Sequence, residues 1–279
     1  MSEEFERIAA IGDPETRARE AGEAMTYHQD LVTKLARVRR AAVAELRATG
    51  LSYAQVAQRL GVTRGRIAQL GVDYGPERRF FGGELITISI PLRAASLLED
   101  RLVIAQEDEQ AATQLADLAE RMDLATTRQH VLPTGEVDFT PDALVLICGP
   151  KSSAVVNELI ATTDPILEFS PDDAGRWRLL NRATGTEFVS PMDREPKEER
   201  DYAYLARLKR PDGRPFLLIA GTHAIGSLGV VHFLSQASTL VWLYEEVELS
   251  PFSMVVGSAF AGSPRRIVSS EAITPPRRH

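Results

Sequence analysis

The N-terminal quarter of the chain has the hydrophobic spacing of a helix. Five apolar residues recur three or four positions apart, namely Leu31, Leu35, Val38, Ala42 and Leu46. Such spacing places all of them on one helical face. Asp13-Pro14 supplies an N-cap followed by a first-turn proline. We therefore expect one long helix, or two abutting ones, over residues 14–48.

A shorter pattern of the same kind follows in residues 51–71. Val56, Ala57 and Leu60 fall on one face of a first helix. Gly61 comes next, and glycine readily takes the positive φ that ends a helix and turns the chain. The small Ala57 also allows a second helix to approach closely. The sequence therefore predicts a short helix that ends in a sharp turn at Gly61.

A second helix is expected directly after this turn. Thr63 is a suitable N-cap, and Ile67 and Leu70 would form the inward face. The outward positions are polar or basic: Arg64, Arg66 and Gln69. We interpret the two helices as a helix-turn-helix. An ordinary helical hairpin is the alternative interpretation.

The segment of residues 35–72 resembles the helix-turn-helix of sigma-factor region 4 and of many bacterial one-component transcriptional regulators. The resemblance implies double-stranded DNA as a partner. On this hypothesis, base edges or phosphates in the major groove are contacted by Arg64, Arg66 and Gln69. Phosphate backbone contacts are expected from Thr63 and from the basic cluster Arg37, Arg39 and Arg40.

The distribution of charge agrees with this hypothesis. The formal charge of the whole chain is −7. Residues 34–66 nevertheless contain eight basic residues against the single acid Glu45, a net +7 that leaves −14 for the rest. A basic module on an acidic body suits DNA binding, because phosphate contacts supply most of the non-specific affinity. A solvated basic helix face is the simpler explanation.

The long N-terminal helix also suggests a second subunit. Its stripe supports the helix-turn-helix, but the portion around Met25, Tyr27 and Leu31 could equally pair with another copy of the chain. Regulators commonly read two half-sites as dimers. We therefore expect a homodimer.

Beyond residue 84 the pattern changes to alternating strands and helices. Strand-like runs are expected at 85–90, 143–148, 166–169, 177–181, 187–190, 216–220, 241–247 and 252–256, and helices at 107–122, 154–161 and 230–234. This alternation predicts an α/β domain that is Rossmann-like, with a mainly parallel sheet and helices on both faces. The expected domains are a helical DNA-binding domain at 1–74, a glycine-rich linker at 75–84, the α/β domain at 85–262 and a disordered tail at 263–279.

Composition narrows the class of protein. The chain of 279 residues is 44% hydrophobic and 25% charged, as in ordinary globular proteins. No apolar run is long enough to span a bilayer, and the acidic N-terminus is unlike a secretory signal. We therefore expect a cytoplasmic protein without membrane contact. The single Cys148 excludes an intramolecular disulfide and a cysteine-cluster metal site.

Two glycine-bearing turns each follow a predicted buried strand, at 149–153 and 221–227. In open α/β sheets, ligands bind beyond the carboxyl ends of the strands, where helix N-termini favour anions. The turns could form two walls of one pocket lined by Gly149, Lys151, Ser152, Ser153, Gly221, Thr222, His223, Gly226 and Ser227. Neither has the spacing of a Walker loop or a dinucleotide fingerprint. The alternative for each is a structural strand-to-helix turn with a capping serine.

These observations favour a ligand-responsive transcriptional regulator, in which a small, anionic, nucleotide-like ligand alters the spacing of two DNA-reading modules. The sequence indicates no particular cofactor. A second hypothesis is an enzyme acting on a nucleotide or nucleoside, for example NAD glycohydrolase-like, with a DNA-targeting arm. Its available carboxylates are Glu107, Asp108, Glu158 and Asp201. A third is an interaction module whose pocket is vestigial.

Overall fold

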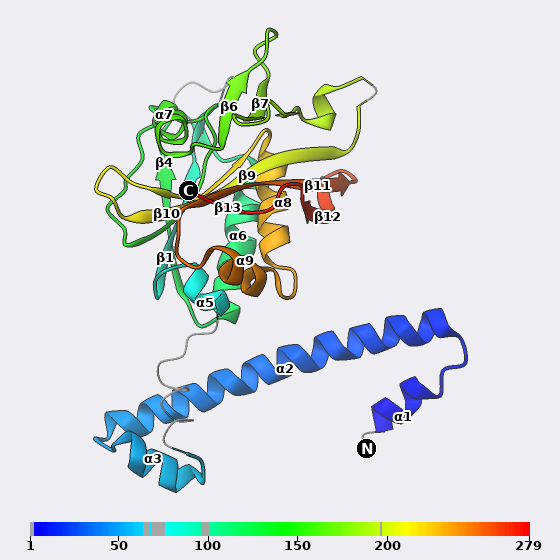
Figure 1. The fold of residues 1–279 in the computed structure, drawn as a ribbon. Helices are drawn as coiled ribbons and strands as arrows, with labels where there is room; N and C mark the ends of the chain where they lie inside the picture. The colour runs from blue at the N-terminus through cyan, green and yellow to red at the C-terminus, as the bar shows by residue number, and fades with distance from the viewer. Residues whose placement is uncertain (1–2, 64–66, 68–75, 96–100, 196) are drawn as a thin grey trace. The chain divides into compact units, whose positions relative to one another are not determined.

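The structure is a computed structural model that describes residues 3–63, 67, 76–95, 101–195 and 197–279. The chain divides into two compact units, Met1–Asp73 and Tyr74–His279 (Figure 1). Each unit has a hydrophobic core of its own. No single helix of the described ranges is long and apolar enough to cross a membrane, although the bent pair formed by residues 224–234 and 239–247 passes the same test of length and composition.

The first unit is helical in its described residues. It contains α1 (Glu3–Ala9), α2 (Pro14–Ala48) and α3 (Tyr53–Leu60). The predicted long helix over residues 14–48 is therefore confirmed. Ser52 caps α3 reciprocally, because its side chain accepts from the Gln55 amide and the Gln55 side chain accepts from the Ser52 amide. Gly61 ends the helix with φ 65°, as its position in the sequence predicts.

The core of this unit joins α2 to the segment after α3. It consists of the buried residues Val43, Val56, Ala57 and Ile67. The Ile67 amide donates to the Thr63 carbonyl at 3.1 Å, the spacing of a helical turn. Arg64, Arg66 and Gln69 lie outside the described residues, as do the side chains of Arg37 and Arg40. The helix-turn-helix therefore stays a prediction.

The second unit is built on a mixed sheet. Its strands are β1 (Leu85–Pro91), β4 (Ala125–Val131), β5 (Ala143–Ile147), β9 (Arg200–Lys209), β10 (Pro215–Gly221), β11 (Phe252–Ala261), β12 (Arg266–Ala272) and β13 (Arg277–Arg278). The order is β12-β11-β9-β10-β5-β1-β4, with β13 also paired to β11. Strands β4, β1, β5 and β10 are parallel to one another, whereas the pairs β10–β9, β9–β11, β11–β12 and β11–β13 are antiparallel. The α/β class is confirmed, but the expectation of a mainly parallel sheet is corrected to a mixed one.

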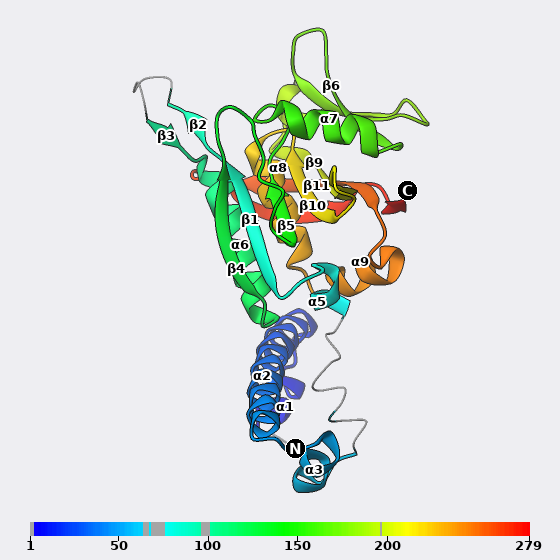
Figure 2. The same ribbon diagram turned by 90° about the vertical axis from the view of Figure 1, so that its left-hand side faces the viewer.

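Helices cover both faces of this sheet (Figures 1 and 2). One face carries α6 (Gln106–Arg121), α8 (Ala224–Leu234) and α9 (Thr239–Val247). The other face carries α7 (Ala154–Thr163) and a small antiparallel sheet of β6 (Leu167–Pro171), β7 (Trp177–Asn181) and β8 (Glu187–Phe188). Side chains of β5 alternate between the two cores, which explains why its sequence is apolar throughout.

Several stretches differ from the sequence-based expectation: β4 was not predicted, and α8 begins at Ala224, within the turn expected at 221–227. The predicted strand at 241–247 is the helix α9, whose buried residues Leu240, Leu243 and Val247 have helical spacing. A short apolar run does not distinguish strand from helix. Strand β9 was not predicted, although its polar residues flank or interrupt a mainly apolar run. Two of them, Asp201 and Arg207, are in fact buried.

The expected linker and tail also contain ordered structure. Within 75–84 lies the short helix α5 (Pro76–Phe80), and Phe80 and Phe81 are buried in the main core. The supposed disordered tail at 263–279 contains β12 and β13, both paired with β11. Composition misleads in the tail, because backbone hydrogen bonds hold these strands without many apolar side chains.

Candidate functional site

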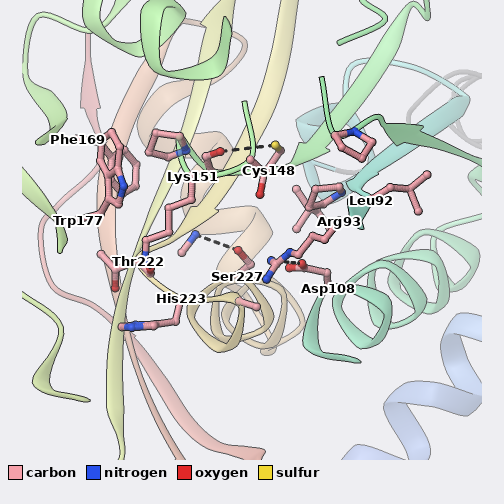
Figure 3. Close-up of a pocket in the computed structure, with 18 of the residues that line it drawn as sticks. Leu92, Arg93, Asp108, Cys148, Lys151, Phe169, Trp177, Thr222, His223 and Ser227 are labelled. Carbon is pink, nitrogen blue, oxygen red and sulfur yellow. Dashed lines mark hydrogen bonds and ion pairs between the residues drawn. The ribbon is translucent and has the colours of Figure 1, made fainter. Parts of the chain in front are cut away.

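A cavity of ≈ 380 Å³ opens at one end of the parallel half of the sheet (Figure 3). It is bordered by Pro91 at the end of β1, Ile147 at the end of β5 and Gly221 at the end of β10. These are the carboxyl ends of three neighbouring parallel strands, where α/β sheets place their ligands.

The two glycine-bearing turns meet in this cavity. The Lys151 ammonium donates to the Thr222 carbonyl oxygen at 3.1 Å and so joins them directly. Of the nine residues expected from the sequence, seven line the cavity: Gly149, Lys151, Ser152, Gly221, Thr222, His223 and Ser227. The other two, Ser153 and Gly226, are not among its lining residues.

Ser153 and Gly226 have structural roles instead. The buried Ser153 hydroxyl caps α7 by accepting from the Val156 amide, and it donates to the Gly135 carbonyl. A Cβ on Gly226 would lie 2.5 Å from a carboxylate oxygen of Asp201. Glycine is therefore required there for α8 to approach β9.

The second turn brings the N-terminus of α8 to the cavity, where the buried Asp201 already accepts from the His223 amide. His223 is the N-cap of α8, but its side chain makes no capping hydrogen bond. The first amides of a helix have no partner within that helix, and together with the helix dipole they favour anions. The Ser227 hydroxyl accepts from the Gly221 amide at 2.9 Å, which leaves its own proton for another acceptor. A Cβ at Gly221 would lie 2.0 Å from the His223 carbonyl, so only glycine fits.

His223 is held between two carboxylates. Its Nδ1 lies 3.3 Å from Asp201 Oδ1, and its Nε2 lies 3.4 Å from Asp193 Oδ1 in the 3-10 helix η1 (Pro191–Asp193). Asp201 is fully buried and also accepts from the Thr222 hydroxyl and the His223 amide. The hydrogen bond to Asp201 raises the pKa of His223, against the opposing effect of burial. The imidazole is therefore more cationic near neutral pH than a free histidine.

A second charged pair lines the cavity. Arg93 Nη2 donates to Asp108 Oδ2 at 2.8 Å, with 46% of the Arg93 side chain exposed but only 4% of that of Asp108. Burial raises the pKa of Asp108 to about 6, although Arg93 opposes this shift. Asp108 is thus the one carboxylate of the enzyme hypothesis that lines the cavity. Asp201 lies behind His223, while Glu107 and Glu158 are not lining residues.

Cys148 also lines the cavity, but it has the character of a core residue. It is buried at the end of β5, and burial raises the pKa of its thiol to about 12. The thiolate is the nucleophilic form of cysteine. Cys148 is therefore not suited to nucleophilic chemistry near neutral pH.

An aromatic wall completes the cavity. Phe169 on β6 and Trp177 on β7 both line it, with ring centroids 6.5 Å apart and an interplanar angle of 68°. These strands were expected from the sequence, but nothing in it places them over the turns that follow β5 and β10. Arg93 was missed for the same reason. The only sequence signal was the presence of bulky aromatic residues in short strands.

No group of three or more metal-ligating side chains forms anywhere in the described part of the chain. No family model, no curated protein and no solved structure matches the chain. A function for this protein is therefore inferred from the chemistry of the cavity and of the N-terminal unit.

Proposed function

We propose that the chain is a DNA-binding transcriptional regulator whose α/β unit binds a small anionic ligand. The observation that carries the ligand half is the convergence of the Lys151 ammonium and the N-terminal turn of α8 in one cavity. An ammonium has three N–H donors, and the Thr222 carbonyl occupies one of them. Charge-assisted hydrogen bonds from such a group to an anion are among the stronger polar interactions in proteins.

The DNA half is supported by the capped helix α3, the left-handed turn at Gly61 and the packing of Ile67 against Val56 and Ala57. In this proposal Arg64, Arg66 and Gln69 contact the major groove, and Thr63, Arg37, Arg39 and Arg40 contact phosphates. The concentration of basic residues at 34–66 in an otherwise acidic chain gives the electrostatic attraction.

A homodimer is part of the same proposal. Large apolar side chains along α2 are exposed, namely Met25, Tyr27, Leu31, Val32, Leu35 and Val38. α3 covers α2 only at its C-terminal end, around Val43 and Leu46. An exposed stripe of this length on a helix is typical of an interaction surface. Pairing of two copies through it would bring two DNA-reading modules into one particle.

The test is selection of a binding site from random duplexes, followed by fluorescence anisotropy with the full chain. Arg66→Ala should weaken binding to the selected duplex at least tenfold and leave the circular dichroism spectrum unchanged. Arg266→Ala, an exposed arginine on β12, is the control and should bind as tightly as the wild type. If the Arg66→Ala variant binds the selected duplex as tightly as the wild type, residues 64–69 are not part of the DNA interface.

A second candidate function, an enzyme acting on a nucleotide or nucleoside, is favoured by one specific observation. Asp108, with a pKa of about 6, and His223 line the same cavity. A carboxyl group poised near neutral pH is suited to general acid catalysis. Incubation of the protein with NAD and common nucleotides, followed by chromatography of the products, separates the two functions. Turnover that Asp108→Asn abolishes supports the enzyme, whereas saturable binding without turnover supports the regulator.

A further inference from the structure

We infer that the cavity takes a nucleoside monophosphate, with the phosphate beside Lys151 and Ser227 at the N-terminal turn of α8 and the planar base against Trp177. This inference rests on the proposed anion-binding role of the cavity and specifies the chemical class of the ligand. It follows from three features of the lining, which are the position of its cations, its aromatic wall and its carboxylates.

The cationic and amide donors gather at one place. Lys151 contacts Thr222, and Thr222 directly precedes His223, the N-cap of α8. Ser227, in the first turns of the same helix, has a hydroxyl proton available. A phosphate bound here receives hydrogen bonds from an ammonium, a hydroxyl and helix amides together. The first turn is less suited, since the Ser153 hydroxyl accepts from the Val156 amide inside the first turn of α7, whereas Asp201 accepts only from the N-cap amide of His223.

Trp177 lines the same cavity from the other layer of the fold. Phe169 packs edge-on to Trp177, and Phe169 packs in turn against the fully buried Tyr204. This row of rings holds Trp177 in place, so that stacking of a ligand does not require the side chain to be ordered first. In Figure 3 the aromatic pair and the Arg93–Asp108 pair lie on opposite sides of the cavity, with Lys151 between them. A purely anionic ligand would make no use of the aromatic wall.

Size and charge restrict the ligand further. A volume of ≈ 380 Å³ is near the lower end for small-molecule pockets, which suits one base, one sugar and one phosphate better than a dinucleotide. Asp108 lines the cavity, and Asp193 stands beside His223. These carboxylates repel additional negative charge, so a monophosphate should bind more tightly than a diphosphate or triphosphate.

The experiment is isothermal titration of the full chain with the four common nucleoside monophosphates, ADP, adenosine, ribose 5-phosphate and inorganic phosphate. We expect at least one monophosphate to bind more tightly than its parts and more tightly than its diphosphate. Trp177→Leu should weaken that binding about 5- to 150-fold, the range that loss of one base–aromatic stack produces. The same variant should bind ribose 5-phosphate as the wild type does.

A fluorescence measurement gives an independent readout with an intact Trp177. The chain has two tryptophans, so Trp242→Phe leaves Trp177 as the single emitter. Stacking of the base should then quench the emission in step with the titration, and ribose 5-phosphate should not.

The outcomes separate this inference from the proposed function. If ribose 5-phosphate or phosphate binds as tightly as every monophosphate and Trp177 does not respond, the cavity is an anion site without a base pocket, and only the inference is wrong. If no phosphate-bearing compound binds at all, the anionic-ligand half of the proposed function fails as well.

Discussion

The ammonium nitrogen of Lys151 lies 3.1 Å from the carbonyl oxygen of Thr222, although 71 residues separate them in the chain. This contact joins the turn after β5 to the turn after β10, two strands that are hydrogen-bonded neighbours in the sheet. It places a cation beside the N-terminal turn of α8. The arrangement makes anion binding at this point directly testable.

Replacement of Lys151 by glutamine should weaken the binding of an anionic ligand. Loss of one charge-assisted hydrogen bond corresponds to roughly a 10- to 150-fold rise in the dissociation constant. Titration with ribose 5-phosphate measures the change. Lys209→Gln, an exposed lysine at the end of β9, serves as the matched control and should leave affinity unaltered. Equal losses in both variants would point to general electrostatics instead of a local contact.

Anion binding should depend on pH through His223. Its pKa is raised by the Asp201 hydrogen bond, with Asp193 adding to the effect and Lys151 opposing it. Both ring nitrogens face carboxylates, so His223 acts on an anion only through its positive charge, which persists to higher pH than in a free histidine and is lost as pH rises through the raised pKa. Affinity for ribose 5-phosphate should fall as pH rises above about 7, where the phosphate, with a second pKa of about 6, is already a dianion. His223→Gln should flatten this profile, and an unchanged slope would exclude His223 as the titrating group.

The raised pKa of His223 also makes the stability of the folded protein depend on pH. The folded protein holds the His223 proton more tightly than the unfolded chain, so this stabilisation is fully present below the unfolded pKa and is lost as pH rises through the folded one.

Asp108 should make folding less favourable as pH rises. Its folded pKa of about 6 exceeds the ordinary value of 3.8, so the folded state prefers the protonated carboxyl and loses stability as pH rises from 3.8 through 6. Asp108→Asn removes this titration. Relative to the wild type, the variant should gain up to about 3 kcal/mol between pH 4 and pH 8. Urea unfolding at several pH values measures the difference.

The exposed Asp117→Asn, on the same helix α6, is the control for this measurement. Its stability should track that of the wild type at every pH. If the free energy of unfolding of Asp108→Asn differs from that of the wild type by the same amount at every pH, burial does not raise the pKa of Asp108.

The α2 stripe should hold two copies of the chain together. Val38 on α2 and Val268 on β12 are each 65% exposed, which makes them matched positions. Val38→Asp places a charge in the stripe and should dissociate the dimer, whereas Val268→Asp should not. Sedimentation equilibrium at micromolar concentration gives the mass of each. A wild-type monomer, or a dimer that survives Val38→Asp, would contradict this interface.

Local features of the fold were predictable where the signal is confined to a few neighbouring residues. Gly61 ends α3, and each of the two glycine-bearing turns links a buried strand to a helix. The identity of α9 was not predictable, since a nine-residue apolar helix and a buried strand have similar composition. Strand β9 was missed because the partners that bury its polar residues come from elsewhere in the chain.

Arg207 on β9 illustrates this limit. Its guanidinium donates to the carbonyls of Phe80, Glu248 and Ser250 and lies 4.8 Å from the centroid of the Phe80 ring. Burial lowers its pKa to about 10. In the sequence it is one arginine within a mainly apolar run, and nothing nearby in the chain indicates which carbonyls it contacts.

The sequence by itself determined the elements whose causes are local, namely the long helix α2, the stop at Gly61, the apolar strand β5 and the glycine turns, together with seven of the residues that line the cavity. Only the tertiary structure decided that the two turns share one cavity, that Trp177 and Arg93 line it, and that Asp108 and Asp201 are buried. The physical reason is the range of the interactions. Helix caps and turns depend on residues a few positions apart, whereas strand order, burial and the pKa shifts that burial causes depend on segments that meet only when the chain is folded.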